Sequence, residues 1–226
     1  MREEFKRLSL QGFLIMQSAA EVTHISWTHK HMDEVIDVLT QADFNELIER
    51  IRQGREFGHA SFEPIFYLVF HPEQILEVKR QQPAWEARLR NEGWDVHTFS
   101  IAEEIADILG KAPLRKIWLA ADQRAPQAWE KTNASLANAI ANGALQDRLE
   151  AKLATLEGKP KAILLVSDLE ALHPFMRIGV IEGKLQGKFH VPTVFFYPGV
   201  RTGKTRLKFL GFYPEDGNYR SVHVGG

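Results

Sequence analysis

The sequence has no cysteine, no excess of charge of either sign and no long apolar run. The absence of cysteine excludes disulfide bonds, thiolate metal ligands and cysteine nucleophiles. With 28 basic and 29 acidic residues the formal net charge is −1, so no general basic surface for nucleic acid is indicated. No apolar run approaches the roughly 18–20 residues that span a bilayer. Because the first residues also lack a signal-peptide pattern, we expect a cytoplasmic protein that does not contact the membrane.

The composition is that of an ordinary globular protein. A chain of 226 residues with 44% hydrophobic and 25% charged residues predicts one folded domain. Residues 1–31 show no sustained period, whereas a helical pattern begins at Met32. We therefore divide the chain into an N-terminal extension, residues 1–31, and a single α/β domain, residues 32–226. The extension is either the product of a start codon assigned too far upstream or a helix and strand that pack on the core.

Apolar runs alternate with helical patterns through the middle of the chain. Residues 65–70 (IFYLVF) and 161–166 (KAILLV) are continuous apolar runs, which are typical of strands buried on both faces of a parallel sheet. Residues 94–99 and 193–197 are predicted as two further strands. This order predicts βαβ units with right-handed crossovers, and hence a Rossmann-like α/β fold whose mainly parallel sheet is flanked by helices.

The end of the chain and two local segments refine this prediction. Residues 206–212 and 219–224 are expected strands with no helix between them, joined by the turn-forming run Pro-Glu-Asp-Gly-Asn. We therefore predict a C-terminal antiparallel hairpin. Ser100 followed by Glu103 matches the capping box that begins a helix. Residues 113–121 fit either a strand or a helix.

The segment Gly199-Val200-Arg201-Thr202-Gly203-Lys204-Thr205 is close to a phosphate-binding P-loop but departs from it. Only three residues separate its glycines where a P-loop has four, and the preceding Pro198 has no amide proton to donate. The residues that follow are typical of a strand, whereas a P-loop precedes a helix. We therefore interpret the segment as a hairpin turn. Four basic residues lie in or directly after this segment: Arg201, Lys204, Arg206 and Lys208. They either contact phosphates or an acidic partner, or are simply solvated.

His173 and Arg177 follow the third buried strand at its carboxyl end, where open α/β sheets bind ligands. One hypothesis makes His173 an acid/base, Arg177 an anion clamp and the protein a small hydrolase that also uses Asp168. The other hypothesis has His173 capping a helix and Arg177 pairing with Asp216 or Glu182. We favour the second hypothesis, because no nucleophile that would partner His173 is evident in the sequence.

Three histidines near the N-terminus, His24, His29 and His31, are followed by Asp33. Transition metals favour imidazole together with carboxylate. These residues lie in the irregular segment that precedes the first helical pattern, which is a poor setting for a rigid set of ligands. We therefore predict no metal site, and nothing in the sequence indicates a cofactor.

The run from residue 161 to residue 223 contains an HPF-x-R element, a P-x-V-x-FYPG segment, an L-x-FLGF strand and a D-x-NYR ending. In order and spacing it resembles the BrxB family of BREX phage-resistance systems, a former domain of unknown function. The resemblance selects family-pattern positions, to which it assigns no catalytic role: His173, Arg177, Tyr197, Pro198, Gly199, Asp216, Tyr219 and Arg220.

The resemblance implies an accessory component of a BREX operon, which also encodes a PglZ-like protein, a large ATPase and a DNA methyltransferase. Our first hypothesis is a non-catalytic assembly or adaptor subunit that binds other BREX subunits. An exposed apolar patch near the C-terminal strands would support this hypothesis. The alternative is a nucleotide- or nucleic-acid-binding α/β domain that uses the basic loop near residues 201–208. The hydrolase hypothesis ranks last.

Overall fold

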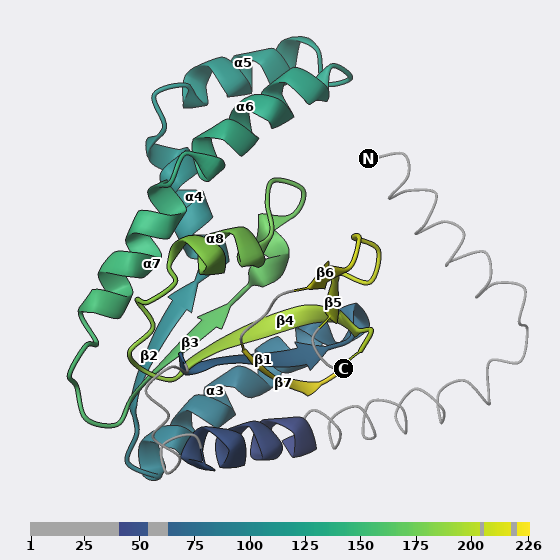
Figure 1. The fold of residues 1–226 in the computed structure, drawn as a ribbon. Coiled ribbons are helices and arrows are strands. Elements are labelled where there is room, and N and C mark those ends of the chain that lie inside the picture. The colour runs from purple at the N-terminus through teal and green to yellow at the C-terminus, as the bar shows by residue number, and fades with distance from the viewer. Residues whose placement is uncertain (1–40, 54–62, 204–205, 218–220) are drawn as a thin grey trace, which may run out of the picture. The chain divides into compact units, whose positions relative to one another are not determined.

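A computed structural model describes residues 41–53, 63–203, 206–217 and 221–226 (Figure 1). The chain divides into two units, residues 1–39 and 40–226, and the described residues all belong to the second. The predictions made for residues 1–31 and for the histidines near the N-terminus therefore lie outside the described residues. The boundary between the predicted extension and the α/β domain stays a prediction.

A parallel sheet with the strand order β2-β3-β4-β1-β7 forms the centre of the fold. Its strands are β1 (Ile65–Phe70), β2 (Asp95–Ser100), β3 (Ala162–Ser167), β4 (Thr193–Arg201) and β7 (Val222–Gly225). Every residue of β1 and β3 is buried, as the continuous apolar runs predicted. The mainly parallel sheet between helices confirms the predicted α/β class.

Helices cover both faces of the sheet (Figure 1). They are α3 (Ile75–Asn91), α4 (Ile101–Lys111), α5 (Arg115–Arg124), α6 (Trp129–Ala141), α7 (Ala144–Ala154) and α8 (Ile178–Lys184), with short 3₁₀ turns η1 (Pro72–Gln74) and η2 (Leu169–Leu172). The helix of residues 41–53 and α3 pack on one face, where Phe44 stacks on Trp85 with ring centroids 4.5 Å apart. Helices α4, α7 and α8 pack on the other. Among the described residues, no helix has both the length and the apolar character that a bilayer span requires.

Two local predictions are decided by hydrogen bonds of the helices. Ser100 Oγ accepts the backbone N–H of Glu103 at 3.2 Å, which confirms the helix start predicted there. The ambiguous segment 113–121 is helical from Arg115 onward. Trp118 is its one buried residue, and the indole Nε1 donates to Ser135 Oγ of α6 at 2.9 Å. A helix lets this one side chain face α6 while its neighbours in the sequence stay exposed.

The predicted antiparallel hairpin is present at the C-terminal end. Strand β4 turns into β5 (Arg206–Phe209), which pairs antiparallel with β4 and with β6 (Asp216–Gly217). The segment that is close to a P-loop therefore connects two antiparallel strands, as expected of a hairpin, although Lys204 and Thr205 lie outside the described residues. Residues 219–224 were expected to be the second arm of the hairpin, and that detail is wrong. Strand β7 pairs in parallel with β1, where buried Val224 joins the apolar cluster on the face of α3.

Gly199 allows β5 to approach β4 closely. A Cβ at this position would lie 2.5 Å from Tyr197 Cε1 and 2.6 Å from the carbonyl oxygen of Lys208, well inside van der Waals contact. The Lys208 contact is with backbone and cannot be relieved by a change of rotamer. The small residue in the FYPG segment is therefore explained by packing.

We expect Gly199→Ala to lower the free energy of unfolding by about 1–3 kcal/mol, the usual cost of overpacking a core. Urea unfolding monitored by circular dichroism measures this change. The matched control is Gly110→Ala in α4, where no heavy atom lies within 4 Å of the added carbon. Since alanine is the better helix former, the control is expected to gain about 0.4–1 kcal/mol. Equal stability of both variants would contradict the packing argument.

Candidate functional site

An ion-pair group ties together the loops at the carboxyl edge of the sheet. Asp168 directly follows β3, and its Oδ2 accepts hydrogen bonds from Ser100 Oγ at 2.5 Å and from Ser167 Oγ at 3.0 Å. Lys79 Nζ, on α3, lies 2.6 Å from Asp168 Oδ1 and 2.6 Å from Glu170 Oε1. The segments that follow β1, β2 and β3 are thereby joined at one carboxylate.

The environment of Asp168 keeps it ionised. Burial alone would raise the pKa of the carboxyl group, but the bonds from Lys79 and Ser100 outweigh burial and hold the pKa below its ordinary value of 3.8. Its backbone has φ 60° and ψ 36°, in the left-handed region that aspartate tolerates better than most residues. A carboxylate with a lowered pKa and such partners is a weak general base. The group serves better as a structural tie than as a catalyst.

His173 is not assembled with Asp168. It ends the 3₁₀ turn η2, where its backbone N–H donates to the carbonyl oxygen of Glu170 at 3.0 Å. Its Nδ1 shares a hydrogen bond of 2.5 Å with the hydroxyl of Tyr213, and its ring lies edge-on against Phe212. Burial lowers the pKa of His173, which keeps the ring neutral. The geometry favours the structural interpretation of His173 over the hydrolase pair.

Three of the family-pattern segments meet in a row of aromatic rings. Ring centroids are 5.5 Å apart between Tyr67 and Tyr197, 5.6 Å between Tyr197 and Phe209, and 5.5 Å between Phe209 and Tyr213. Tyr213 continues the row to His173. Each such pair contributes about 0.5–1.5 kcal/mol beyond its burial. The HPF element, the FYPG segment and the FLGF strand are therefore in contact as parts of one core.

Three further family-pattern positions have structural contacts only: Pro198, Arg177 and Asp216. Pro198 is buried in β4, and its carbonyl oxygen accepts the N–H of Leu210 at 2.9 Å. Arg177 precedes α8 as its N-cap residue. Its predicted pairing with Asp216 or Glu182 is wrong: within the described residues Arg177 forms no ion pair, and Asp216 lies in β6. Glu182 instead accepts a hydrogen bond from the hydroxyl of Tyr67, which lies in β1.

The basic residues of the hairpin do not converge on one point. Arg201 Nε donates to a backbone carbonyl inside the turn at 3.1 Å, and Arg206 Nη1 lies 3.4 Å from Glu215 Oε2. Arg206 and Lys208 share the outer face of β5, because the residues between and after them are buried. Three predicted site residues lie outside the described residues: Lys204, Tyr219 and Arg220.

A group of titratable side chains around Tyr67 was missed from the sequence. The Tyr67 hydroxyl donates to Glu182 Oε2, and burial raises the pKa of Glu182 to about 6. The ring of His223 lies edge-on to Tyr67 with centroids 5.4 Å apart, and burial lowers the pKa of His223 to about 4. The pairing of β7 with β1 brings His223 to Tyr67, and α8 brings Glu182, so no local sequence pattern indicates this group. Within the described part of the chain no three His, Asp or Glu side chains are placed to share a metal ion.

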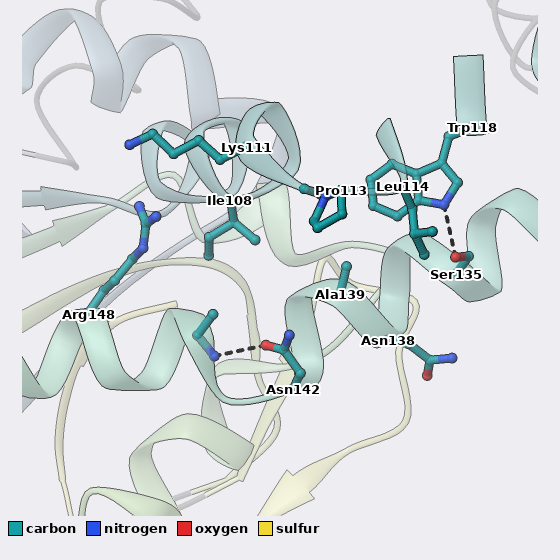
Figure 2. A pocket seen from close by; sticks show the side chains of 12 residues that line it. Ile108, Lys111, Pro113, Leu114, Trp118, Ser135, Asn138, Ala139, Asn142 and Arg148 are labelled. Carbon is teal, nitrogen blue, oxygen red and sulfur yellow. Dashed lines mark hydrogen bonds between the residues drawn. The ribbon is translucent and has the colours of Figure 1, made fainter. Parts of the chain in front are cut away.

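A cleft of about 620 Å³ lies between α4, α5, α6 and α7 (Figure 2). Its walls are mainly apolar and include Ile108, Ala112, Pro113, Leu114, Trp118, Ala139 and Ala144. Figure 2 shows Lys111 and Arg148 at one end and Trp118 at the other. At the basic end Arg148 is neutralised by Glu104 and Asp107, at 2.6 Å and 2.7 Å.

Helices α5 and α6 form a helical arm, residues 114–141, that packs on α4 and α7 and lies away from the strands (Figure 1). It carries four of the exposed large apolar side chains of the described residues: Leu114 (45% exposed), Ile117 (63%), Leu119 (46%) and Trp129 (39%). An apolar patch near the C-terminal strands, which would have supported the adaptor hypothesis, is not seen among the described residues. Near those strands only Phe212 is comparably exposed among the described residues, because β5 and β7 turn their apolar side chains into the core.

The fold and the site together define an α/β protein. Its titratable side chains at the sheet bind one another, and exposed apolar side chains lie on its helical arm. The sequence model of the family described as BREX protein BrxB matches residues 98–224, more than half of the chain. The chain belongs to the BrxB family, and membership makes it a component of a BREX phage-resistance system. No curated protein and no solved structure matches it. The matched range includes the arm, the cleft and the aromatic row except Tyr67.

The pKa of Glu182 predicts a pH-dependent stability. In the folded state the pKa of Glu182 is about 6, above its ordinary value of 4.5. Between pH 4.5 and pH 6 the carboxyl group is therefore protonated more fully in the folded state than in the unfolded state. The stability that this group contributes is therefore full below pH 4.5 and is lost as the pH rises through 6. We expect the free energy of unfolding of Glu182→Gln, relative to the wild type, to rise by about 2 kcal/mol between pH 4.5 and pH 7. Urea unfolding across this range measures it.

The control for this experiment is His223→Gln. The folded pKa of His223, about 4, lies below its ordinary 6.5, so its contribution is lost as the pH falls from 6.5 through 4. The relative stability of this variant should therefore rise towards low pH, opposite to Glu182→Gln. A difference from the wild type that stays constant with pH would show that Glu182 is not held in a desolvated site.

Proposed function

We propose that this BrxB-family protein is a non-catalytic assembly or adaptor subunit of a BREX complex, and that the helical arm is the surface through which it acts. Its partners are then other BREX subunits: the PglZ-like protein, the large ATPase and the methyltransferase. The observation that carries the proposal is the exposed apolar surface of the arm.

The arm exposes more apolar surface than its own folding explains. Leu114, Ile117 and Leu119 stand within six consecutive residues, and each is at least 45% exposed. Burying one such side chain fully contributes about 1.5–3 kcal/mol. Large apolar side chains that gather, exposed, on one short element mark interaction sites in soluble proteins. Since the arm packs on other helices and not on the sheet, a partner can cover it without changing the core.

The groups that would support catalysis favour the same proposal. Asp168 is bound by Lys79 and two hydroxyl groups, and His173 is bound by Tyr213. The hydroxyl groups that Asp168 binds belong to Ser100 and Ser167, and within the described residues His173 forms no hydrogen bond with either of them. Their contacts are accounted for by the joining of loops and the packing of the aromatic row, which are the needs of a stable scaffold.

We expect the double variant Ile117→Ser/Leu119→Ser to capture at least tenfold less of its BREX partner than the wild type. The tagged protein is purified from cells that express the whole operon, with nuclease present, and the captured subunits are quantified. Both side chains are exposed, so the stability of the variant should change by no more than about 0.5 kcal/mol each.

The matched control is Leu76→Ser on α3, which removes a side chain that is 71% exposed on a different helix. Its capture of partners should equal that of the wild type. Undiminished capture by the arm variant would remove the arm from the interface. A wild-type protein that captures no BREX subunit under any condition would remove the adaptor function itself.

A second candidate function, nucleic-acid binding, is favoured by one observation. Phe212 is 62% exposed in the turn after β5, the strand whose outer face carries Arg206 and Lys208. An exposed aromatic ring beside cations is the combination that binds single-stranded nucleic acid, by stacking and by phosphate contact. The basic hairpin would then act alongside the arm on a separate part of the surface.

We expect Lys204→Ala/Arg206→Ala, on this alternative, to weaken binding to single-stranded DNA and to lower the slope of log K against log salt by about 1.4. Fluorescence anisotropy with a labelled oligonucleotide, at several salt concentrations, gives both quantities. Lys159→Ala/Lys161→Ala, which changes two exposed cations in the turn before β3, serves as the control. If the hairpin variant binds like the wild type, the hairpin is not the site.

A further inference from the structure

The cleft and the exposed part of the arm form one surface. Leu114 and Trp118 line the cleft, and Ile117 lies one helical turn beyond Leu114 on α5. We call the cleft together with Leu114 and Ile117 the arm–cleft surface. Its apolar floor, Ile108 of α4, belongs to the domain core, so the surface is anchored to the fold and is not confined to the arm.

We propose that the arm–cleft surface binds an amphipathic helix with an acidic polar face, contributed by another BREX subunit. This inference rests on the adaptor function proposed above and adds the chemistry of the partner segment.

The walls of the cleft favour a helix as the occupant. They are built by α4, α5, α6 and α7, whose backbone groups are hydrogen-bonded within each helix, and no strand edge borders the cleft. An extended segment would therefore find no backbone partners there. A helix needs none, because it satisfies its own backbone and inserts side chains into an apolar groove.

The charges of the arm favour an acidic partner. Residues 114–141 carry four cations, Arg115, Lys116, Arg124 and Lys131, and two anions, Asp122 and Glu130, in a chain whose formal net charge is −1. None of the four cations forms an ion pair within the part of the chain that the structure describes, and all four are exposed. At the far end of the cleft the charges already cancel, since Arg148 and Lys111 bind Glu104 and Asp107. The attraction for an anionic helix is therefore concentrated on α5.

Two other occupants fit the surface less well. A small ligand would need several polar groups to orient it, yet Ser135 is bound by Trp118 and the Asn142 side-chain oxygen by the N–H of Ala144, which leaves Asn138 as the main polar group of the cleft. A second copy of this chain would bring two arms together, each with the same excess of cations, and like charges across an interface are unfavourable. An acidic amphipathic helix meets both the apolar wall and the charge.

Site-specific cross-linking tests the occupant directly. Ile117 is replaced by a photoreactive phenylalanine derivative in the full chain, which is expressed with its operon, irradiated and analysed by mass spectrometry. The expected product joins α5 to a segment of another BREX subunit that has helical apolar periodicity and Asp or Glu on its polar face. The same replacement at Leu76 is the control and should give no such product. Cross-links to a basic or extended segment, or to a second copy of this chain, overturn the proposal.

Charge reversal tests the acidic face. Arg115→Glu/Lys116→Glu/Arg124→Glu should lower capture of the cross-linked subunit at least tenfold at low salt, whereas Lys159→Glu/Lys161→Glu/Lys184→Glu, which reverses three exposed cations elsewhere, should not. Reversing the acidic residues of the captured helix to lysine should restore binding to the arm variant. If the wild type captures a subunit and the arm variant captures it equally well, the acidic helix is excluded while the adaptor function stands. If the wild type captures no subunit, both proposals fail.

Discussion

The central strands β3, β4 and β1 are apolar on both faces, and the rest of the structure depends on covering them. Side chains alternate along each strand, so Leu164 and Ile163 must be buried against different layers. The helix of residues 41–53 and α3 supply one layer, and α4, α7 and α8 supply the other. Helix α6 adds only Ile140 to this second layer, and α5 adds no residue to either apolar cluster. Helix α5 is thereby left with exposed apolar side chains, Ile117 and Leu119.

The same constraint decides where function is to be sought. In open α/β sheets ligands bind at the carboxyl ends of the strands. In this protein that edge is closed by Asp168, which binds Lys79, Ser100 and Ser167 at once. Opening this edge to a ligand would separate a partly buried ion pair and leave its charges unpaired, which is unfavourable. The apolar cleft beside α5 carries no such cost, because its walls are already exposed and only gain from being covered.

The parts of this fold that could be predicted are those encoded by local pattern. Strands β1 and β3 could be predicted because each is a run of apolar residues, which in β3 ends only at Ser167. The start of α4 could be predicted because the Ser100 hydroxyl caps its first turn. The pairing of β7 with β1 could not be predicted, since β7 is short and its choice of neighbour depends on the apolar surface that β1 leaves uncovered. For the same reason Tyr67, Glu182 and His223 gave no signal: their pKa values arise from burial between elements that are far apart in the sequence. The exposure of Ile117 could not be predicted either, since it depends on which side of α5 packs on α6 through Trp118.

The helical arm and the basic hairpin differ in how their interactions respond to salt. A phosphate contact depends on counterion release, so its affinity falls steadily as salt is added. An apolar cleft flanked by cations combines two terms: the charge attraction is screened within a Debye length of about 3 Å at 1 M salt, while apolar burial persists. A complex held by the arm–cleft surface should therefore weaken to a plateau, set by the burial of Leu114, Ile117 and the cleft walls, instead of vanishing. Because charge mainly accelerates association and apolar burial mainly slows dissociation, an adaptor built this way would find its partner through α5 and retain it through the cleft.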